Sequence, residues 1–189
     1  MKIMVVVAHP RKESLCSGIF RAIISQLESL GHEVDCCDLY DEQFDACLRV
    51  EDEPDWDNPG KIYSDAVINY QARIVISDSL VLVFPIWWWS FPAILKGWID
   101  RVWNNGWAYG SKKIPVSSVL VFSTASATSD TYSAEGYKDA IDQQIGKGIF
   151  EYCGIKDYSL NIYYDILSSD DGLNNILNDV INIINGKFA

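Results

Sequence analysis

Three consecutive tryptophans, Trp87, Trp88 and Trp89, follow an apolar run at residues 80–84 that is typical of a buried strand. Adjacent indoles offer large, rigid apolar faces on which a planar ligand can stack. A helix is predicted immediately afterwards, over residues 93–103, so the tryptophan run joins the end of a strand to the start of a helix. This is more flat aromatic surface than core packing requires. We interpret it as the wall of a site for a flat, aromatic cofactor.

Polar side chains suited to an anion lie in the loop at residues 9–15, after the first predicted strand. Arg11, Lys12, Ser14 and Ser17 surround the predicted start of a helix. Backbone N–H groups at a helix N-terminus, together with hydroxyls and a guanidinium, can hold a phosphate. Ser14 is equally typical of an ordinary N-cap, and the neighbouring tryptophan run favours the phosphate interpretation. The loop lacks G-x-G-x-x-G and the P-loop pattern, so we expect neither a Rossmann-type dinucleotide site nor an NTPase.

The stretch from Ser123 to Tyr132 is rich in hydroxyls and small residues. Such a loop can approach the edge of a heteroaromatic ring and donate backbone N–H groups to its carbonyl oxygens. It is also typical of a flexible surface loop. The predicted strand order, which brings it close to the tryptophan run, favours the functional interpretation.

Strands and helices are predicted to alternate along the whole chain. The expected strands cover residues 3–8, 33–37, 79–84, 116–123 and 158–164. The expected helices cover residues 15–30, 61–77, 93–103, 133–152 and 173–184, with Gly31 and Gly186 ending the first and last. This alternation predicts a single α/β domain over residues 1–189, a three-layer sandwich whose five-stranded parallel sheet has the flavodoxin-like order 2-1-3-4-5. In that order the loops after strands one, three and four meet at the carboxyl edge of the sheet.

Composition and charge exclude some functions. The chain has 189 residues, of which 49% are hydrophobic and 22% charged, as in an ordinary globular domain. Its net charge of −11 argues against a nucleic-acid binder, which needs clustered Lys and Arg. Nine acidic residues lie in the segment 38–57, against the single base Arg49. We interpret this acidic connection as a solvated link, and a docking face for a basic partner as the weaker alternative.

No targeting or metal-binding pattern is evident. The apolar run at residues 3–8 is too short for a secretory signal or a membrane span, so we expect a cytoplasmic protein without an integral membrane segment. The five cysteines then remain free thiols, with strand alternation turning one of Cys36 and Cys37 inward and the other outward. Two histidines are too few for a His-rich metal site, and no metal is expected.

The segment FPIWWWSFPAILKGWIDRVWNNGWAYG closely resembles the NAD(P)H:quinone oxidoreductases, the DT-diaphorase-like flavoproteins. The start VVVAHPRKES resembles the strand, turn and helix with which members of that family begin, and the late run YCGI is similar as well. The family also includes bacterial quinone reductases and flavin-containing ancillary subunits of potassium efflux systems. The resemblance covers nearly the whole chain. It implies a flavodoxin-like fold, a non-covalent FAD or FMN, and a homodimer with the flavin at the subunit interface.

The resemblance also implies roles for individual residues. His9, Ser14, Leu15 and Cys16 would lie by the pyrophosphate and ribityl chain; Pro85, Ile86, Trp87, Trp88 and Trp89 would line the isoalloxazine; and Ser123, Thr124, Ala125 and Ser126 would lie at its other edge. In the family a hydride passes from NAD(P)H to the flavin and then to a quinone, in a ping-pong scheme. Tyr132 matches a tyrosine that hydrogen-bonds the flavin, where it could stabilise charge on the reduced ring.

Two departures from the family pattern bear on the chemistry. The usual T-T-G-G is replaced by Ser123-Thr124-Ala125-Ser126, whose side chains could narrow the approach to the flavin edge. The histidine that follows the tyrosine by six residues in animal enzymes is Lys138 here, which could replace its role only in part, electrostatically.

Three functions are compared on this basis, with the reductase favoured. The first alternative is a regulatory flavoprotein subunit of a potassium-efflux transporter, for which the acidic residues 41–57 are the only support. The second is a one-electron carrier like flavodoxin, which has no need of a deep tryptophan-walled pocket. The long connection at residues 45–61 could cover an adenine, which favours FAD and leaves FMN open.

Overall fold

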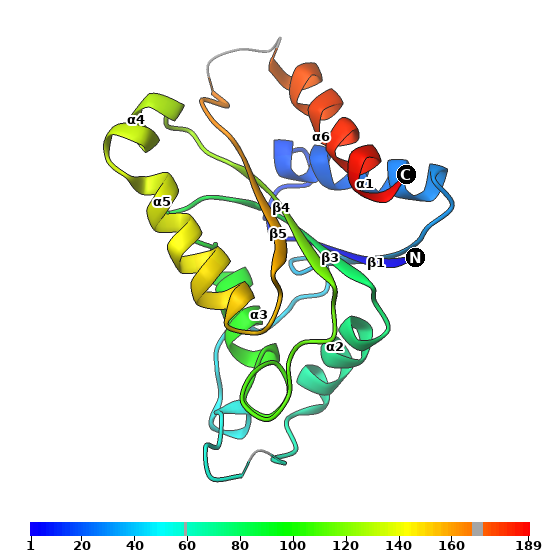
Figure 1. Ribbon diagram of the computed structural model, residues 1–189, viewed down its shortest axis with the longest axis vertical. Helices are drawn as coiled ribbons and strands as arrows, with labels where there is room; N and C mark the ends of the chain where they lie inside the picture. The colour runs from blue at the N-terminus through cyan, green and yellow to red at the C-terminus, as the bar shows by residue number, and fades with distance from the viewer. Residues whose placement is uncertain (59, 168–171) are drawn as a thin grey trace.

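A five-stranded parallel sheet runs through the centre of the molecule, with helices on both faces (Figure 1). The computed structural model describes residues 1–58, 60–167 and 172–189. The strands are β1 Lys2–Val7, β2 Glu33–Asp38, β3 Ser79–Pro85, β4 Ser118–Thr124 and β5 Asp157–Tyr163. Their order is β2-β1-β3-β4-β5, which confirms the predicted topology.

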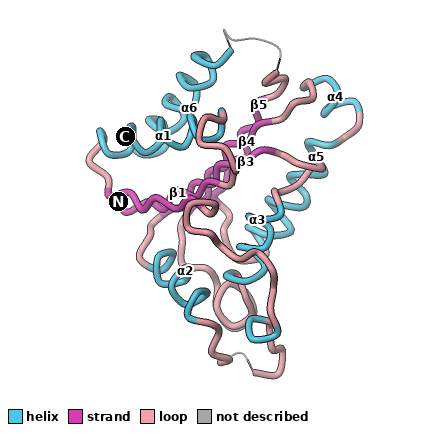
Figure 2. Tube along the Cα trace, turned by 180° about the vertical axis from the view of Figure 1, so that it is seen from behind, coloured by secondary structure: helices cyan, strands magenta, loops and turns pink. Residues whose placement is uncertain are grey.

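Two helical layers cover the sheet. The helices are α1 Leu15–Ser29, the 3-10 turn η1 Val50–Asp52, α2 Asp65–Val75, α3 Ala93–Val102, α4 Ser129–Ala134, α5 Tyr137–Ile141, the π-helical segment η2 Asp142–Glu151 and α6 Gly172–Phe188. In both views α1 and α6 lie together on one side of the sheet, and α2 and α3 lie on the other (Figures 1 and 2).

Side chains along β1 point alternately to the two faces of the sheet, so this one strand contributes to both cores. Ile3, Val5 and Val7 pack into the core beneath α1 and α6. Met4 and Val6 face the opposite core, which includes Trp98 of α3. Because both faces of the central strands are covered, β3 and β4 are buried at every position, as a parallel sheet requires.

Three predicted helices have different bounds in the structure. The helix expected at residues 61–77 is α2, which begins at Asp65 after its N-cap Ser64. The helix expected at residues 133–152 is divided into α4, α5 and η2. Gly136 adopts a left-handed φ of +70° and separates α4 from α5, whereas α5 continues directly into the π-helical η2. The last helix does not stop at Gly186. It continues to Phe188, whose buried ring belongs to the core beneath α1 and α6.

The acidic connection is not solvated along its whole length. Asp52 is fully buried and receives hydrogen bonds from Arg101 Nη2 at 2.7 Å and from the Ser64 N–H at 2.8 Å. Burial alone would raise the pKa of this carboxyl, but the bonds from Ser64 and Arg101 outweigh it and lower the pKa. The solvated interpretation is therefore wrong at Asp52, where an ion pair fastens the connection to α3. The predicted split of the vicinal thiols is confirmed, with Cys36 exposed and Cys37 buried.

Candidate functional site

A cavity of about 170 Å³ opens at the carboxyl edge of the sheet. It is lined by His9, Arg11, Ser14, Leu15, Cys16, Pro85, Ile86, Trp87, Thr124, Ser126 and Ile166. The loops after β1, β3 and β4 thus meet where the sequence predicted, and they bring ten of the fourteen predicted cofactor-binding residues to one cavity. Ile166 follows β5, and no pattern in the sequence pointed to it.

The side of the cavity formed by α1 has a regular helix start. Ser14 is the N-cap, as predicted, and its hydroxyl accepts from the Ser17 N–H at 3.2 Å. The Ser17 hydroxyl in turn donates to the Arg11 carbonyl at 2.8 Å, which fixes the loop before the helix. Leu15 and Cys16, the first two helical residues, line the cavity. The positive end of a fifteen-residue helix therefore faces it, which favours an anionic ligand.

His9 adds a hydrogen-bonding ring beside this helix start. The Arg11 N–H can only donate, and it lies 3.1 Å from His9 Nδ1. Nδ1 also lies 3.3 Å from the Arg11 carbonyl oxygen, so it accepts from the amide in the Nε2–H tautomer and donates to the carbonyl in the Nδ1–H tautomer. Burial lowers the pKa of His9 and the charge of Arg11 lowers it further, against a hydrogen bond to the Arg11 backbone that raises it. In the Nε2–H tautomer, Nε2 is left to donate to a ligand.

The opposite side of the cavity is a strained reverse turn, which we name the tryptophan turn (residues 87–90). The backbone of Trp87 and Ser90 is paired by hydrogen bonds of 3.2 and 3.1 Å. Between them Trp88 and Trp89 have left-handed φ values of +51° and +55°. Such a turn normally carries Asn-Gly, and the left-handed conformation costs roughly 1–2 kcal/mol for each bulky residue.

The tryptophan turn directs its indoles outward. Trp87, Trp88 and Trp89 are 42%, 89% and 39% exposed, so none of the three serves as core filling. Trp87 lines the cavity, and its ring lies 6.3 Å from that of His9. Trp88 and Trp89 do not line the cavity of the single chain. Backbone strain that presents apolar surface to solvent is typical of functional sites.

Besides Trp88 and Trp89, four residues to which the family resemblance assigns roles do not line the cavity. Ser123 and Ala125 are buried in the sheet, since β4 extends to Thr124 and alternation leaves Thr124 and Ser126 to face the site. Tyr132 is 3% exposed and packs between the rings of Tyr137 and Tyr164, at 5.9 and 4.9 Å.

Burial raises the pKa of the Tyr132 phenol, which keeps it protonated. Lys138 is exposed on α5 and does not line the cavity either.

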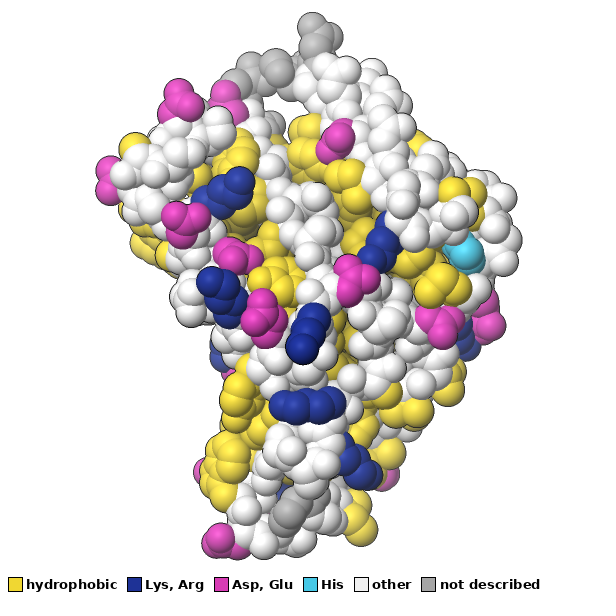
Figure 3. Space-filling model, in the orientation of Figure 1, with side chains coloured by type: hydrophobic (Ala, Val, Ile, Leu, Met, Phe, Trp, Pro, Cys, Tyr) yellow, Lys and Arg dark blue, Asp and Glu magenta, His cyan; other side chains and the backbone are white. Residues whose placement is uncertain are grey.

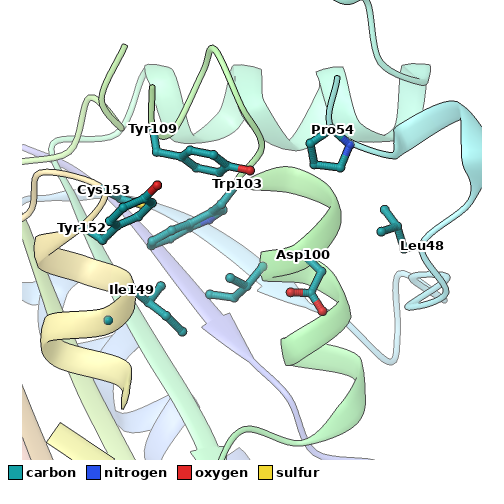
Figure 4. Close-up of a pocket in the computed structure, with 10 residues that line it drawn as sticks. Leu48, Pro54, Asp100, Trp103, Tyr109, Ile149, Tyr152 and Cys153 are labelled. Atoms are coloured by element: carbon teal, nitrogen blue, oxygen red, sulfur yellow. The ribbon is translucent and has the colours of Figure 1, made fainter. Parts of the chain in front are cut away.

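A second, larger cavity of about 290 Å³ lies beside α3 (Figure 4). Its walls come from α3 and the loop after it, from the end of η2, and from the acidic connection. They carry Leu48, Pro54, Ile99, Asp100, Trp103, Tyr109, Gly148, Ile149, Tyr152 and Cys153. The ring centroids of Tyr109 and Tyr152 are 5.5 Å apart at one side of this cavity. No sequence pattern predicts this cavity, because its residues come from four separate stretches of the chain.

Comparison with known proteins agrees with the architecture. A model of the flavodoxin-like fold family matches residues 1–182. An uncharacterized NAD(P)H oxidoreductase of Escherichia coli, YcaK, is 40% identical over 157 residues, covering 82% of this chain and 80% of the relative. The chain belongs to the flavodoxin-like fold family.

Solved structures of flavodoxin-like proteins superpose on almost the whole chain. An NAD(P)H:quinone oxidoreductase from Methanothermobacter marburgensis has a TM-score of 0.88 at 25% identity, covering 97% of this chain and 95% of the other. An FMN-dependent NADH-azoreductase from Bacillus anthracis, solved with FMN, has a TM-score of 0.74 at 17% identity over the full length of both chains, and shows the fold alone.

Within 1–58, 60–167 and 172–189, no group of three or more His, Cys, Asp or Glu side chains is placed to hold a metal ion. Among the same residues, no helix has the length and apolar character needed to cross a membrane.

Proposed function

We propose that the chain is a flavin-dependent NAD(P)H:quinone oxidoreductase, which passes two electrons as a hydride from NAD(P)H to a quinone or similar acceptor. The observation that carries this proposal is the pairing, in one cavity, of an anion-binding helix start with an outward-facing aromatic turn. These are the two halves of a flavin nucleotide, a phosphate and a flat ring. The names of the relatives in Escherichia coli and Methanothermobacter marburgensis support the same activity.

The residues present fit a flavin. Arg11 and the N-terminus of α1 offer positive potential and backbone donors to the phosphate, and His9 adds a donor in its Nε2–H tautomer. Pro85, Ile86 and Trp87 offer an apolar face to the ring, and Thr124 and Ser126 lie at the other edge. A bound flavin supplies the hydride chemistry itself, whereas the protein supplies position, electrostatics and exclusion of water.

The chain's own residues would then orient the substrates and hold a proton. Trp88 and Trp89 offer further flat surface on which a nicotinamide or a quinone can stack, and stacking brings donor and acceptor to reacting distance. Tyr132 does not line the cavity of the single chain, and burial keeps its phenol protonated; we propose that its hydroxyl donates to charge on the ring in the assembled enzyme. Tyr132→Phe should therefore slow hydride transfer by about 10²-fold, as removal of such a donor typically does, while flavin stays bound. An unchanged rate in stopped-flow would remove Tyr132 from the mechanism.

We further propose that the active species is a homodimer. A cavity of about 170 Å³ is smaller than the roughly 300–1,000 Å³ of ordinary ligand pockets, so a second copy is needed to enclose the flavin. Trp88, at 89% exposed, is an apolar surface that such a partner would cover. Figure 3 shows further hydrophobic side chains along the lower left edge, where Figure 1 places the acidic connection. Light scattering should give twice the chain mass, and a monomer that turns over at full rate would exclude the dimer.

FAD is the form of flavin that we propose, with FMN as the alternative. The larger cavity offers the flat rings of Trp103, Tyr109 and Tyr152 to an adenine, together with the carboxylate of Asp100. Leu48 and Pro54 of the connection line this cavity as well.

The regulatory alternative gains no support, because acidic residues of the connection are used internally. Asp45 pairs with Arg49, and Asp52 pairs with Arg101. Five unpaired cysteines agree with the reducing conditions of the cytoplasm, which we propose as its location.

One experiment tests the main proposal. The purified protein should be yellow, or quench the fluorescence of added FAD or FMN, and should oxidise NADH or NADPH in the presence of a short panel of quinones. Denaturation followed by chromatography of the released flavin identifies the cofactor. A protein that binds neither flavin and shows no turnover would overturn the proposal.

A further inference from the structure

We propose that Tyr137 is a positioning residue, which braces the tryptophan turn and Tyr132 against each other so that the two sides of the ring site move as one unit. This inference rests on the proposed function and assigns a role to a residue that no motif pointed to. Tyr137 is the first residue of α5 and is half-buried.

The first contact is with the tryptophan turn. The rings of Trp89 and Tyr137 have centroids 4.4 Å apart with an interplanar angle of 38°, which is a close, tilted ring contact. Trp89 has a left-handed backbone and a side chain that is 39% exposed, so the main chain and the core do little to hold its indole. The ring of Tyr137 therefore supplies the support that the turn lacks.

A second contact strengthens this support, from the continuous helical arm formed by α5 and η2 (residues 137–151). The Ser90 hydroxyl donates to Oε1 of Gln144 in η2 at 3.1 Å. The tryptophan turn is thus attached to the α5–η2 arm at Trp89 by a ring contact and at Ser90 by a hydrogen bond. Two attachments at adjacent residues resist rotation of the turn better than one.

The third contact runs in the other direction, to Tyr132. The rings of Tyr132 and Tyr137 meet edge to face at 5.9 Å, and Tyr132 packs in the same way on Tyr164 at 4.9 Å. Trp89, Tyr137, Tyr132 and Tyr164 therefore form a continuous aromatic row that joins the loops after β3, β4 and β5. Tyr137 is the member that contacts both Trp89 and Tyr132.

The geometry of Gly136 places this ring. Its φ of +70° ends α4 and begins α5, and no heavy atom lies within 4 Å of where a Cβ would be. The left-handed conformation changes the direction of the chain between α4 and α5, and the space around Gly136 would accommodate a side chain. The break in the expected helix at residues 133–152 thus has a use, because it turns Tyr137 toward the tryptophan turn.

The test compares Tyr137→Leu, which removes the ring, with Tyr137→Phe, which keeps it. Because an aromatic pair contributes about 0.5–1.5 kcal/mol beyond area burial, Tyr137→Leu should weaken flavin retention and raise the KM for the quinone by up to roughly tenfold. Tyr137→Phe should stay within about twofold of wild type. Tyr158→Leu, a half-buried tyrosine at the amino end of β5, is the matched control for loss of a ring. Equal effects of Tyr137→Leu and Tyr158→Leu would overturn the brace.

A double-variant cycle identifies the route through Trp89. If Tyr137 acts by holding Trp89, the pair Tyr137→Leu with Trp89→Leu should be no worse than Trp89→Leu alone. Strictly additive effects on flavin affinity and KM would contradict the proposal.

A readout without flavin separates the brace from the proposed function. Near-ultraviolet circular dichroism of the flavin-free protein should lose the same band in Tyr137→Leu and in Trp89→Leu. A spectrum unchanged by Tyr137→Leu would overturn the brace. Failure of the wild-type chain to bind flavin would instead overturn the proposed function and leave this measurement valid.

Discussion

The loop after β1 and the turn after β3 face the same cavity, and they hold their functional groups in different ways. At the loop, the cap of α1 and the hydrogen bonds of Ser14, Ser17 and Arg11 satisfy the backbone without strain. At the turn, two bulky residues adopt left-handed φ values and present their indoles to solvent. A phosphate can be held by regular helix geometry, whereas a flat ring needs side chains where the fold does not naturally place them.

The turn is where the largest effect is expected. Replacing Trp88 and Trp89 together by Asn and Gly gives the pair that this turn prefers. It removes a strain of about 1–2 kcal/mol per residue, so the free energy of unfolding of the flavin-free protein should rise by about 2–3 kcal/mol. Urea unfolding measures this gain. Turnover with a quinone should fall sharply in the same variant, because the stacking surface is gone.

A fall in the free energy of unfolding would show that the turn is not strained. The matched comparison is Gly136→Ala, which adds the same kind of left-handed penalty at a position with open space. That variant should lose about 1 kcal/mol. Together, the two variants test whether a left-handed backbone lowers the free energy of unfolding both at the tryptophan turn and at the start of α5.

On the other side of the cavity, Ser14→Ala should weaken both the fold and the ligand site. Loss of an N-cap typically lowers the free energy of unfolding by about 1 kcal/mol. Flavin affinity should fall as well, because the hydroxyl lines the cavity. Ser64→Ala is the control, since Ser64 caps α2 away from this cavity and should lower stability without changing flavin affinity. An equal loss of flavin affinity in both variants would remove Ser14 from the site.

A smaller effect is expected from pH, through His9. Burial lowers the pKa of the folded ring below its ordinary 6.5, so the unfolded chain binds more protons in the interval below 6.5. Stability therefore rises with pH through that interval and is lost as pH falls toward the folded pKa. Protonated Nδ1 can only donate, so it exchanges the bond from the Arg11 N–H for one to the Arg11 carbonyl. The added positive charge favours the phosphate, so flavin affinity measured from pH 7.5 down to 5.5 should fall less steeply in wild type than in His9→Gln, and parallel curves would contradict this.

The sequence predicted the loop after β1 more fully than the turn after β3. Buried apolar runs and alternating helices predicted all five strands and their order, because periodicity records burial directly. The Ser14 cap was predicted as well, because an N-cap depends only on the residues next to the start of the helix. The left-handed tryptophan turn was not, because Trp-Trp is among the last pairs that turn rules would place there.

The other differences depend on tertiary structure. Ser123 and Ala125 do not line the cavity, and only the end of β4 at Thr124 determines which side chains face it. The expectation of a solvated Asp52 is wrong, because its partner Arg101 is 49 positions away in the chain. Tyr137 had no local signal, since its role depends on how α5 lies against a turn some fifty residues earlier.

The smallest effect is expected from Lys138, and it sharpens the difference between the two halves of the site. Lys138 is exposed on α5 and directly follows Tyr137, whose ring contacts Trp89. The charge of Lys138 and the ring of Tyr137 can therefore be removed in separate variants. An exposed charge contributes typically up to about 1 kcal/mol, which limits the loss of kcat in Lys138→Gln to about fivefold. Raising the salt concentration should reduce the difference from wild type further, because exposed charges are screened. A loss as large as that of Tyr132→Phe, unchanged by salt, would mean that the amine approaches the ring in the assembled enzyme, and that the α5 side contributes charge as well as shape.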